Sequence, residues 1–196
     1  MISILRRLVR GKRNSHLCLS EKYPEYEIGK ESYGNIELFK FGEDAGLKIG
    51  AYTSIANGVK IFLGGEHRMD WVTTFPFNVL WKEGLGIKGH PKTKGDVVIG
   101  SDVWIASNAV ILSGVQIGDG AVIGANAVVS KNVPAYGVAA GNPSKVVKYR
   151  FDEETIAQLL KIKWWEWDRQ RITNALPAML DNDLEKFVKG VNEGLY

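Results

Sequence analysis

The stretch VVIGSDVWIASNAVILSGVQIGDGAVIGANAVVSKNV, residues 97–133, decides the fold. An aliphatic residue stands at every sixth position, and a small or β-branched residue stands four positions after each. The aliphatic positions are Ile99, Ile105, Ile111, Ile117, Ile123 and Val129, and those that follow them are Val103, Ala109, Val115, Ala121, Ala127 and Val133. A spacing of six drifts around a helix of about 3.6 residues per turn, whereas offsets of four and six keep side chains on one face of a strand. The pattern predicts a hexapeptide β-helix, a solenoid of short stacked strands.

The repeat is interrupted between two blocks. Ile49, Ile55 and Ile61 keep the same spacing, but the distance from Ile61 to Ile99 is not a multiple of six. The chain from about 62 to 96 is therefore expected to leave the solenoid as an excursion loop, and its segment GLGIKGHPKTKG has the composition of turns. Long loops on a rigid scaffold commonly carry function, and His67 lies near the start of this one.

The segment FDEETIAQLLKIKWWEWD, after the last hexapeptide, predicts a helix from about Asp152, with acidic residues in its first turn. A weaker helical pattern covers about 180–191, and the tryptophans of WWEW are expected to pack this cap or, alternatively, to contact a planar ligand. The expected organisation is mainly β: a basic N-terminal arm (1–27), a β-helix (28–150) and a C-terminal α-helical cap (151–196).

Net charge and residue composition limit the classes of function and the kinds of binding partner that fit the chain. The net charge of +3 is too small to indicate nucleic-acid binding. The local excess of Arg6, Arg7, Arg10, Lys12 and Arg13 predicts a solvated arm or, alternatively, a peripheral contact with an anionic membrane surface. One cysteine, Cys18, excludes an internal disulfide and suits a reducing cytoplasm.

Four segments together carry a family resemblance: GGEHRMDWVTTFPF, the hexapeptides, AAGNPSKVVKYRF and LLKIKWWEWD. They resemble the xenobiotic acetyltransferase branch of the hexapeptide acyltransferases, which includes chloramphenicol and streptogramin acetyltransferases. The resemblance covers roughly Ile49 to Trp167. It implies a left-handed parallel β-helix, a homotrimer and acetyl-CoA as the acetyl donor. The left-handedness rests on the resemblance alone, because the repeat spacing does not specify it.

The resemblance implies that His67, in its GxxHR context, is the catalytic base; the alternative is a loop histidine without chemical duty. A neutral imidazole suits the deprotonation of an acceptor, because its ordinary pKa of about 6.5 is close to working pH. Cys18 lies outside every family motif, so direct transfer is favoured over a covalent intermediate. Asp70 is either a partner of His67 or a solvated carboxylate.

The resemblance also implies a set of residues that face coenzyme A. Alternatives are coil geometry for the small residues and a solvated face for the lysines, and Arg150 is a weaker addition. No metal site is expected, because none of the three histidines lies in the regular coils. The implied cofactor residues are Trp104 beside the thioester arm, Ser107 and Ala125 one coil apart, Ser130 and Lys131 near the adenosine, and Lys145 and Lys148 near the phosphates.

The segment KESYGNIELFKFGEDAGLK, residues 30–48, bears on the acceptor. Drug-modifying members of the branch have a longer, tyrosine-rich segment here that walls the antibiotic site. The compact segment therefore favours a small-molecule acceptor such as a sugar or sugar nucleotide of surface-polysaccharide synthesis, with its hydroxyl ahead of its amine. An antibiotic hydroxyl is the alternative acceptor, and a non-catalytic trimeric scaffold is the alternative outside the enzymes.

Overall fold

The computed structural model describes residues 18–42 and 44–196. The basic residues from Arg6 to Arg13 therefore lie outside the described part, and their expected role is a prediction only. The described chain begins with helix α2 (Leu19–Lys22) and strands β1 (Glu27–Ile28), β2 (Tyr33–Phe39), β3 (Leu47–Ile49) and β4 (Ser54–Phe62). After the excursion loop come β5 (Val97–Ile99), β6 (Trp104–Ile105), β7 (Val110–Ile111), β8 (Gln116–Ile117), β9 (Val122–Ile123) and β10 (Val128–Val129).

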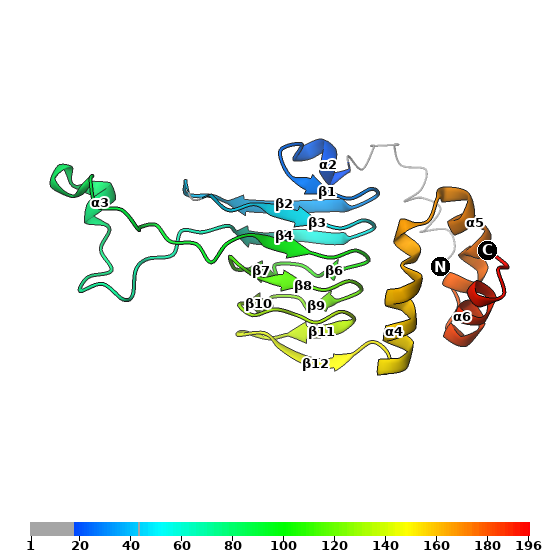
Figure 1. Cartoon of the computed structure of the whole chain (residues 1–196). Coiled ribbons are helices and arrows are strands. Elements are labelled where there is room, and N and C mark those ends of the chain that lie inside the picture. Colours follow the sequence, from blue (N-terminus) through cyan, green and yellow to red (C-terminus); the bar gives the residue numbers. More distant parts are fainter. Residues whose placement is uncertain (1–17, 43) are drawn as a thin grey trace, which may run out of the picture.

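Parallel pairing stacks these short strands into coils (Figure 1). Ile99 pairs with Ile117, and Ile105 pairs with Ile123, so each strand meets the strand three hexapeptides later. One sheet has the order β1-β3-β5-β8. The other has the order β10-β7-β4-β6-β9-β11-β12, where β11 is Gly137–Ala140 and β12 is Lys145–Tyr149, and β2 pairs with β4. The predicted β-helix-like solenoid of hexapeptides is confirmed, and its handedness stays an expectation from the resemblance.

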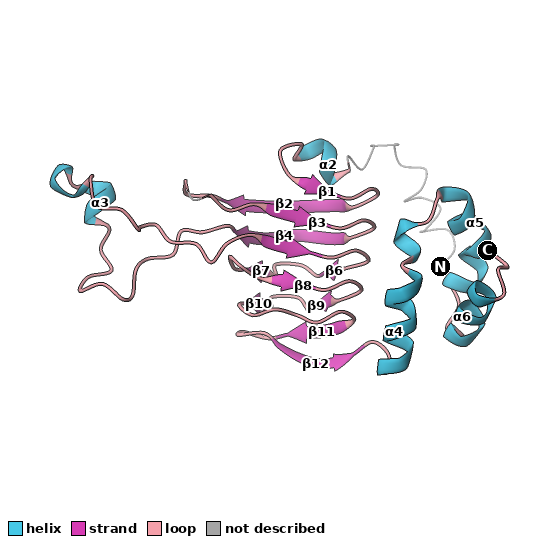
Figure 2. Ribbon diagram, in the orientation of Figure 1, coloured by secondary structure: helices cyan, strands magenta, loops and turns pink. Residues whose placement is uncertain are grey.

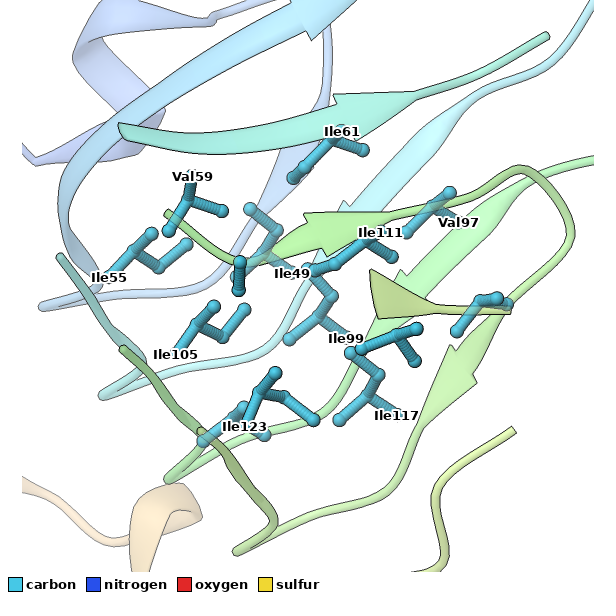
Figure 3. Packing of buried hydrophobic residues seen from close by; sticks show 14 of the residues in the cluster. Ile49, Ile55, Val59, Ile61, Val97, Ile99, Ile105, Ile111, Ile117 and Ile123 are labelled. Carbon is cyan, nitrogen blue, oxygen red and sulfur yellow. The ribbon is translucent and has the colours of Figure 1, made fainter. Parts of the chain in front are cut away.

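The repeated aliphatic residues form the core of the solenoid. Figure 3 shows Ile99, Ile105, Ile111, Ile117 and Ile123 pointing into its interior, and each is at most 2% exposed. Each buried isoleucine contributes about 1.5–3 kcal/mol by leaving water. Backbone bonds such as Gly100 N to Ile117 O, at 2.8 Å, tie successive coils together.

Each coil turns at three corners, named here by their residues. The first corner comprises 100–103, 118–121 and 134–137; the second comprises 106–109 and 124–127; the third comprises 112–115 and 130–133, and the excursion loop leaves the solenoid there. The left-handed φ angles of Asn108 and Asn126, 60° and 57°, mark the second corner, and this conformation favours Asn and Gly. Gly100 is required at the first corner, because a Cβ there would lie 2.6 Å from the backbone nitrogen of Asp119.

The excursion loop connects β4, which ends at Phe62, to β5, which begins at Val97. It carries α3 (Phe77–Leu80) and the short 3-10 helix η1 (Lys82–Gly84) at its tip, and it projects from one side of the coils (Figure 1). Glu66 and Lys92 exchange two backbone hydrogen bonds, of 3.0 and 2.8 Å, and so hold the two limbs of the loop together near its base.

The chain after the coils forms a hairpin and then helices. Strand β11 (Gly137–Ala140) pairs antiparallel with β12 (Lys145–Tyr149), and α4 (Glu153–Ile162), η2 (Trp164–Glu166), α5 (Arg169–Met179) and α6 (Leu184–Asn192) follow. These helices lie on the side opposite the excursion loop (Figure 2). The ring of Trp164 lies 5.0 Å from that of Tyr52, and Trp165 and Trp167 are at most 7% exposed, so all three tryptophans pack against neighbouring residues. No described helix is long and apolar enough to cross a membrane.

Helix α5 was not predicted from the sequence, although its neighbours were. Pro177 lies inside it, and a proline normally argues against a helix interior because it lacks an N–H donor. The helix begins with a cap that supports it: the side chain of Asp168 accepts from Arg171 N. Packing of Ala175 and Ala178 against the cluster around Phe187 then outweighs the local preference.

Candidate active site

His67 lies at the base of the excursion loop, five positions after the end of β4. Its Nδ1 lies 2.7 Å from the carbonyl oxygen of Thr74, farther along the same loop. A carbonyl oxygen can only accept a hydrogen bond, so Nδ1 carries the proton and donates. In the neutral ring, Nε2 then holds the free lone pair, which is the state of a general base.

A cavity of about 360 Å³ adjoins His67 at the third corner. It is lined by residues of the loop base together with Leu112 and Ser113 of the solenoid. Glu66 is fixed at its edge, since Ser113 Oγ donates to Glu66 Oε1 at 2.8 Å and Lys94 Nζ lies 3.3 Å from the same oxygen. The histidine therefore faces a cavity whose wall is held by the coil beneath it.

Asp70 is bonded to Arg68, not to His67. Arg68 Nε donates to Asp70 Oδ1 at 2.7 Å, and Arg68 Nη2 donates to Asp70 Oδ2. This bidentate pair holds the pKa of Asp70 well below its ordinary range. Arg68 Nη1 also donates to Gly89 O at 3.2 Å, and the guanidinium lies 5.0 Å from the ring centre of Trp71. Asp70 thus braces the loop, and the group that orients His67 is a backbone carbonyl.

A second histidine reaches the same place from the other limb of the loop. The ring of His90 lies 4.6 Å from that of His67, centre to centre, at an interplanar angle of 81°. The sequence motifs did not single out His90, because 22 residues separate the two histidines and only the closed loop brings them together. Its position in GHP, inside a turn-rich segment, was the one available signal.

Five of the expected cofactor residues lie together at the second corner and on the adjoining strands. Ser107 and Ala125 are both exposed on neighbouring coils, where Asn126 N donates to Ser107 O at 3.0 Å. Trp104 is 55% exposed and pairs with Val122 on the next coil. Val122 pairs with Val138, and Val138 pairs with Lys148. Lys148 therefore lies three strands from Trp104, roughly 14 Å away. Lys145 is also exposed on β12, opposite Ala140.

Ser130 and Lys131 lie at the third corner instead. The preceding residue, Val129, accepts from Leu112 N at 3.0 Å, so these residues are one coil from the lining of the His67 cavity. In one chain the expected site residues thus form two groups: His67, Ser130 and Lys131 at the third corner, and the other five around the second.

Arg150 has a structural role at the first corner. Its Nη1 lies 3.1 Å from Asp102 Oδ2 and donates to Gly120 O at 2.8 Å, while its guanidinium stacks over Tyr136 and Phe151. Burial raises the pKa of Asp102, although the charge of Arg150 acts in the opposite direction. Within the described residues, no group of three or more His, Cys, Asp or Glu side chains is placed to hold a metal ion.

Comparisons with known proteins place the chain in a family. The family model for bacterial transferase hexapeptide (six repeats) matches residues 96–131. A probable macrolide acetyltransferase of Lysinibacillus sphaericus is 46% identical over 152 residues, covering 75% of this chain and 84% of the relative. A chloramphenicol acetyltransferase of Agrobacterium fabrum is 42% identical over 179 residues, covering 83% and 86%.

Among solved structures, the polySia-specific acetyltransferase NeuO is 28% identical with a TM-score of 0.48, over 64% of this chain and 55% of that one. This overlap is too partial to indicate an acceptor. The identity and coverage of the two sequence relatives are decisive. The chain belongs to the xenobiotic acetyltransferase branch of the hexapeptide-repeat acyltransferases, and it is an acetyltransferase that uses acetyl-CoA as its donor.

Proposed function

We propose that the protein transfers the acetyl group of acetyl-CoA directly to a hydroxyl of its acceptor, with His67 as the general base. The observation that carries this proposal is the bond from His67 Nδ1 to Thr74 O, which leaves Nε2 free to accept a proton. As the acceptor oxygen attacks the thioester carbonyl, Nε2 takes the hydroxyl proton. The carbon–sulfur bond then breaks, the proton passes to the sulfur, and the products are an acetyl ester and coenzyme A.

The expected cofactor residues are exposed and arranged so that they could bind acetyl-CoA. Trp104, Ser107 and Ala125 present an exposed indole and two small residues, along which the thin pantetheine arm of the cofactor would lie. Lys145 and Lys148, exposed at the edge of the same sheet, would hold its phosphates. Ser130 and Lys131 would contact the adenosine end from the third corner of a neighbouring chain.

A homotrimer would unite the two groups of residues. They lie at different corners of one solenoid, so a cofactor in contact with both is most simply held between two solenoids. The tip of the excursion loop also exposes an apolar surface, which is typical of an interaction site. Its residues are Val79, Leu80, Trp81, Leu85 and Ile87, each more than half exposed.

The acceptor best supported by the comparisons is an antibiotic hydroxyl. The two sequence relatives described above are named as a probable macrolide acetyltransferase and a chloramphenicol acetyltransferase, and the present chain covers 84% and 86% of their lengths. A sugar hydroxyl is the second candidate. It is favoured by the compact segment 30–48, within which β2 pairs parallel with β4 and shifts register once, between Gly34 and Ile36.

The test is an acceptor panel with purified protein. Release of free thiol from acetyl-CoA would be measured with chloramphenicol, a macrolide, a streptogramin and several nucleotide sugars. His67→Ala is expected to lower turnover on the best acceptor by about 10²- to 10⁴-fold, the usual range for a general base. Near-normal turnover by this variant would exclude His67 as the base, and failure to bind coenzyme A would support a scaffold instead.

The trimer is tested by complementation. Light scattering gives the mass of the assembly, and mixed trimers of His67→Ala and Lys148→Glu chains would regain activity if the two residues act across a chain boundary. Activity that stays at the level of the separate variants would place both residues in a site within one chain.

A further inference from the structure

The catalytic loop contains a second histidine, His90, whose role no motif assigns. We propose that His90 is a positioning residue: its ring holds the imidazole of His67 in the orientation that a general base requires. The proposal rests on the proposed role of His67. Its starting observation is the edge-to-face contact of the two rings, at 4.6 Å and 81°.

The contact with His90 restricts the tilt of the His67 ring, which the hydrogen bond of His67 does not fix. The bond from Nδ1 to Thr74 O fixes one point of the ring, but the ring can still tilt about that point. A second ring packed nearly at right angles restricts this tilt, because edge-to-face contacts between rings are favourable and directional. The two contacts together define where Nε2 points.

The backbone around His90 is fastened to the loop on several sides. Asn78 Nδ2 donates to His90 O at 3.1 Å, and it also donates to Ile87 O at 3.0 Å. The preceding residue, Gly89, accepts from Arg68, the neighbour of His67. The paired backbones of Glu66 and Lys92 close the loop beside them. His90 therefore cannot move away from His67 unless several hydrogen bonds break.

The contact between His90 and His67 is a contact between rings, not a hydrogen bond. Both ring nitrogens are buried, and neither has a hydrogen-bond partner among the described residues. Replacing a buried polar group by an apolar group of the same shape is close to neutral or stabilising, whereas removing the whole side chain leaves a void. Phenylalanine should therefore substitute for His90, and alanine should not.

The experiment compares His90→Ala with His90→Phe in the full chain, on the acceptor of highest turnover in the panel. His90→Ala is expected to lower kcat by about 10- to 100-fold, because misplacing a reacting group by roughly 1 Å costs about that much. The KM for acetyl-CoA should stay within about twofold, since the loss would fall on an interaction made in the transition state. His90→Phe should recover most of kcat, and its Tm should equal or exceed that of the wild type.

A second measurement does not depend on the acceptor. NMR of the histidine side-chain nitrogens reports the tautomer of His67, and the chain has only three histidines to assign. The wild type and His90→Phe should show the proton on Nδ1, and His90→Ala should show exchange between the two tautomers.

The matched control is Thr93→Val. Thr93 Oγ1 donates to Leu63 O at 2.6 Å and so ties the base of the same loop without contacting the ring of His67. This variant is expected to lower Tm with little change in kcat, which separates loop stability from ring position.

Two results would overturn the inference. If His90→Ala kept kcat while His67→Ala was inactive, His90 would not position the base. If His90→Phe were as slow as His90→Ala, the ring nitrogens would be needed and the ring contact would not explain the role. An active His67→Ala would instead refute the proposed function of His67, which is a different outcome from either.

Discussion

The coils and the excursion loop are built on opposite principles. In the coils, the same parallel bonds and the same aliphatic contacts recur in every turn, as with Ile105 and Ile123 at zero exposure. In the loop, Met69, Val72 and Leu85 are well exposed, and the fold depends on individual bonds such as the pair of Arg68 and Asp70. Regular repetition thus supplies stability, and irregular contacts place the candidate base.

The strongest test of this contrast is Ile111→Ala in the coil. Ile111 is fully buried, so the variant should lose about 2–5 kcal/mol of unfolding free energy through lost burial and the cavity left behind. Val72→Ala in the loop is the control, because Val72 is fully exposed and should change stability by less than about 0.5 kcal/mol. Urea unfolding of both variants measures the difference, and equal losses would contradict the contrast.

A pair of glycine substitutions sharpens the same comparison. In Gly100→Ala the new Cβ would lie 2.6 Å from the backbone of Asp119, so neighbouring coils must shift at a cost of about 1–3 kcal/mol. Gly86→Ala, in the loop, meets no atom within 4 Å and should be neutral or stabilising by up to about 1 kcal/mol. Thermal unfolding of the two variants measures these changes in stability. If Gly86→Ala lowered stability as much as Gly100→Ala, the loop would be packed as tightly as the coils.

The smallest effect concerns pH and is confined to the loop. Arg68 lowers the pKa of Asp70, so their pair stabilises the loop fully above the ordinary carboxyl range and loses this contribution as pH falls through the lowered pKa. Protonation of Asp70 should therefore loosen Arg68 and change the surroundings of Trp71, whose ring centre lies 5.0 Å from the guanidinium. Tryptophan fluorescence of the wild type, with Trp71→Phe subtracted, should report this change. Asp70→Asn should lack the transition, and an unchanged transition would exclude Asp70 as its source.

Sequence reasoning succeeded where the pattern is local and repeated. The six-residue spacing predicted the pairing of Ile99 with Ile117, and the break after Ile61 marked where the chain leaves the coils. It was less complete for the site. Arg150 was a minor candidate for the cofactor, and the structure adds its contacts with Asp102 and Gly120, which cross coils and which no motif records.

The sequence by itself determined the solenoid and the family, because each hexapeptide carries the same side-chain code for strand, corner and core. Only the tertiary structure decided how His67 is oriented. Its partner is the carbonyl of Thr74, a backbone group that any residue would supply, and its neighbour His90 comes from the far limb of the loop. Such contacts depend on how the loop closes on itself, and side-chain identity along the chain does not encode them.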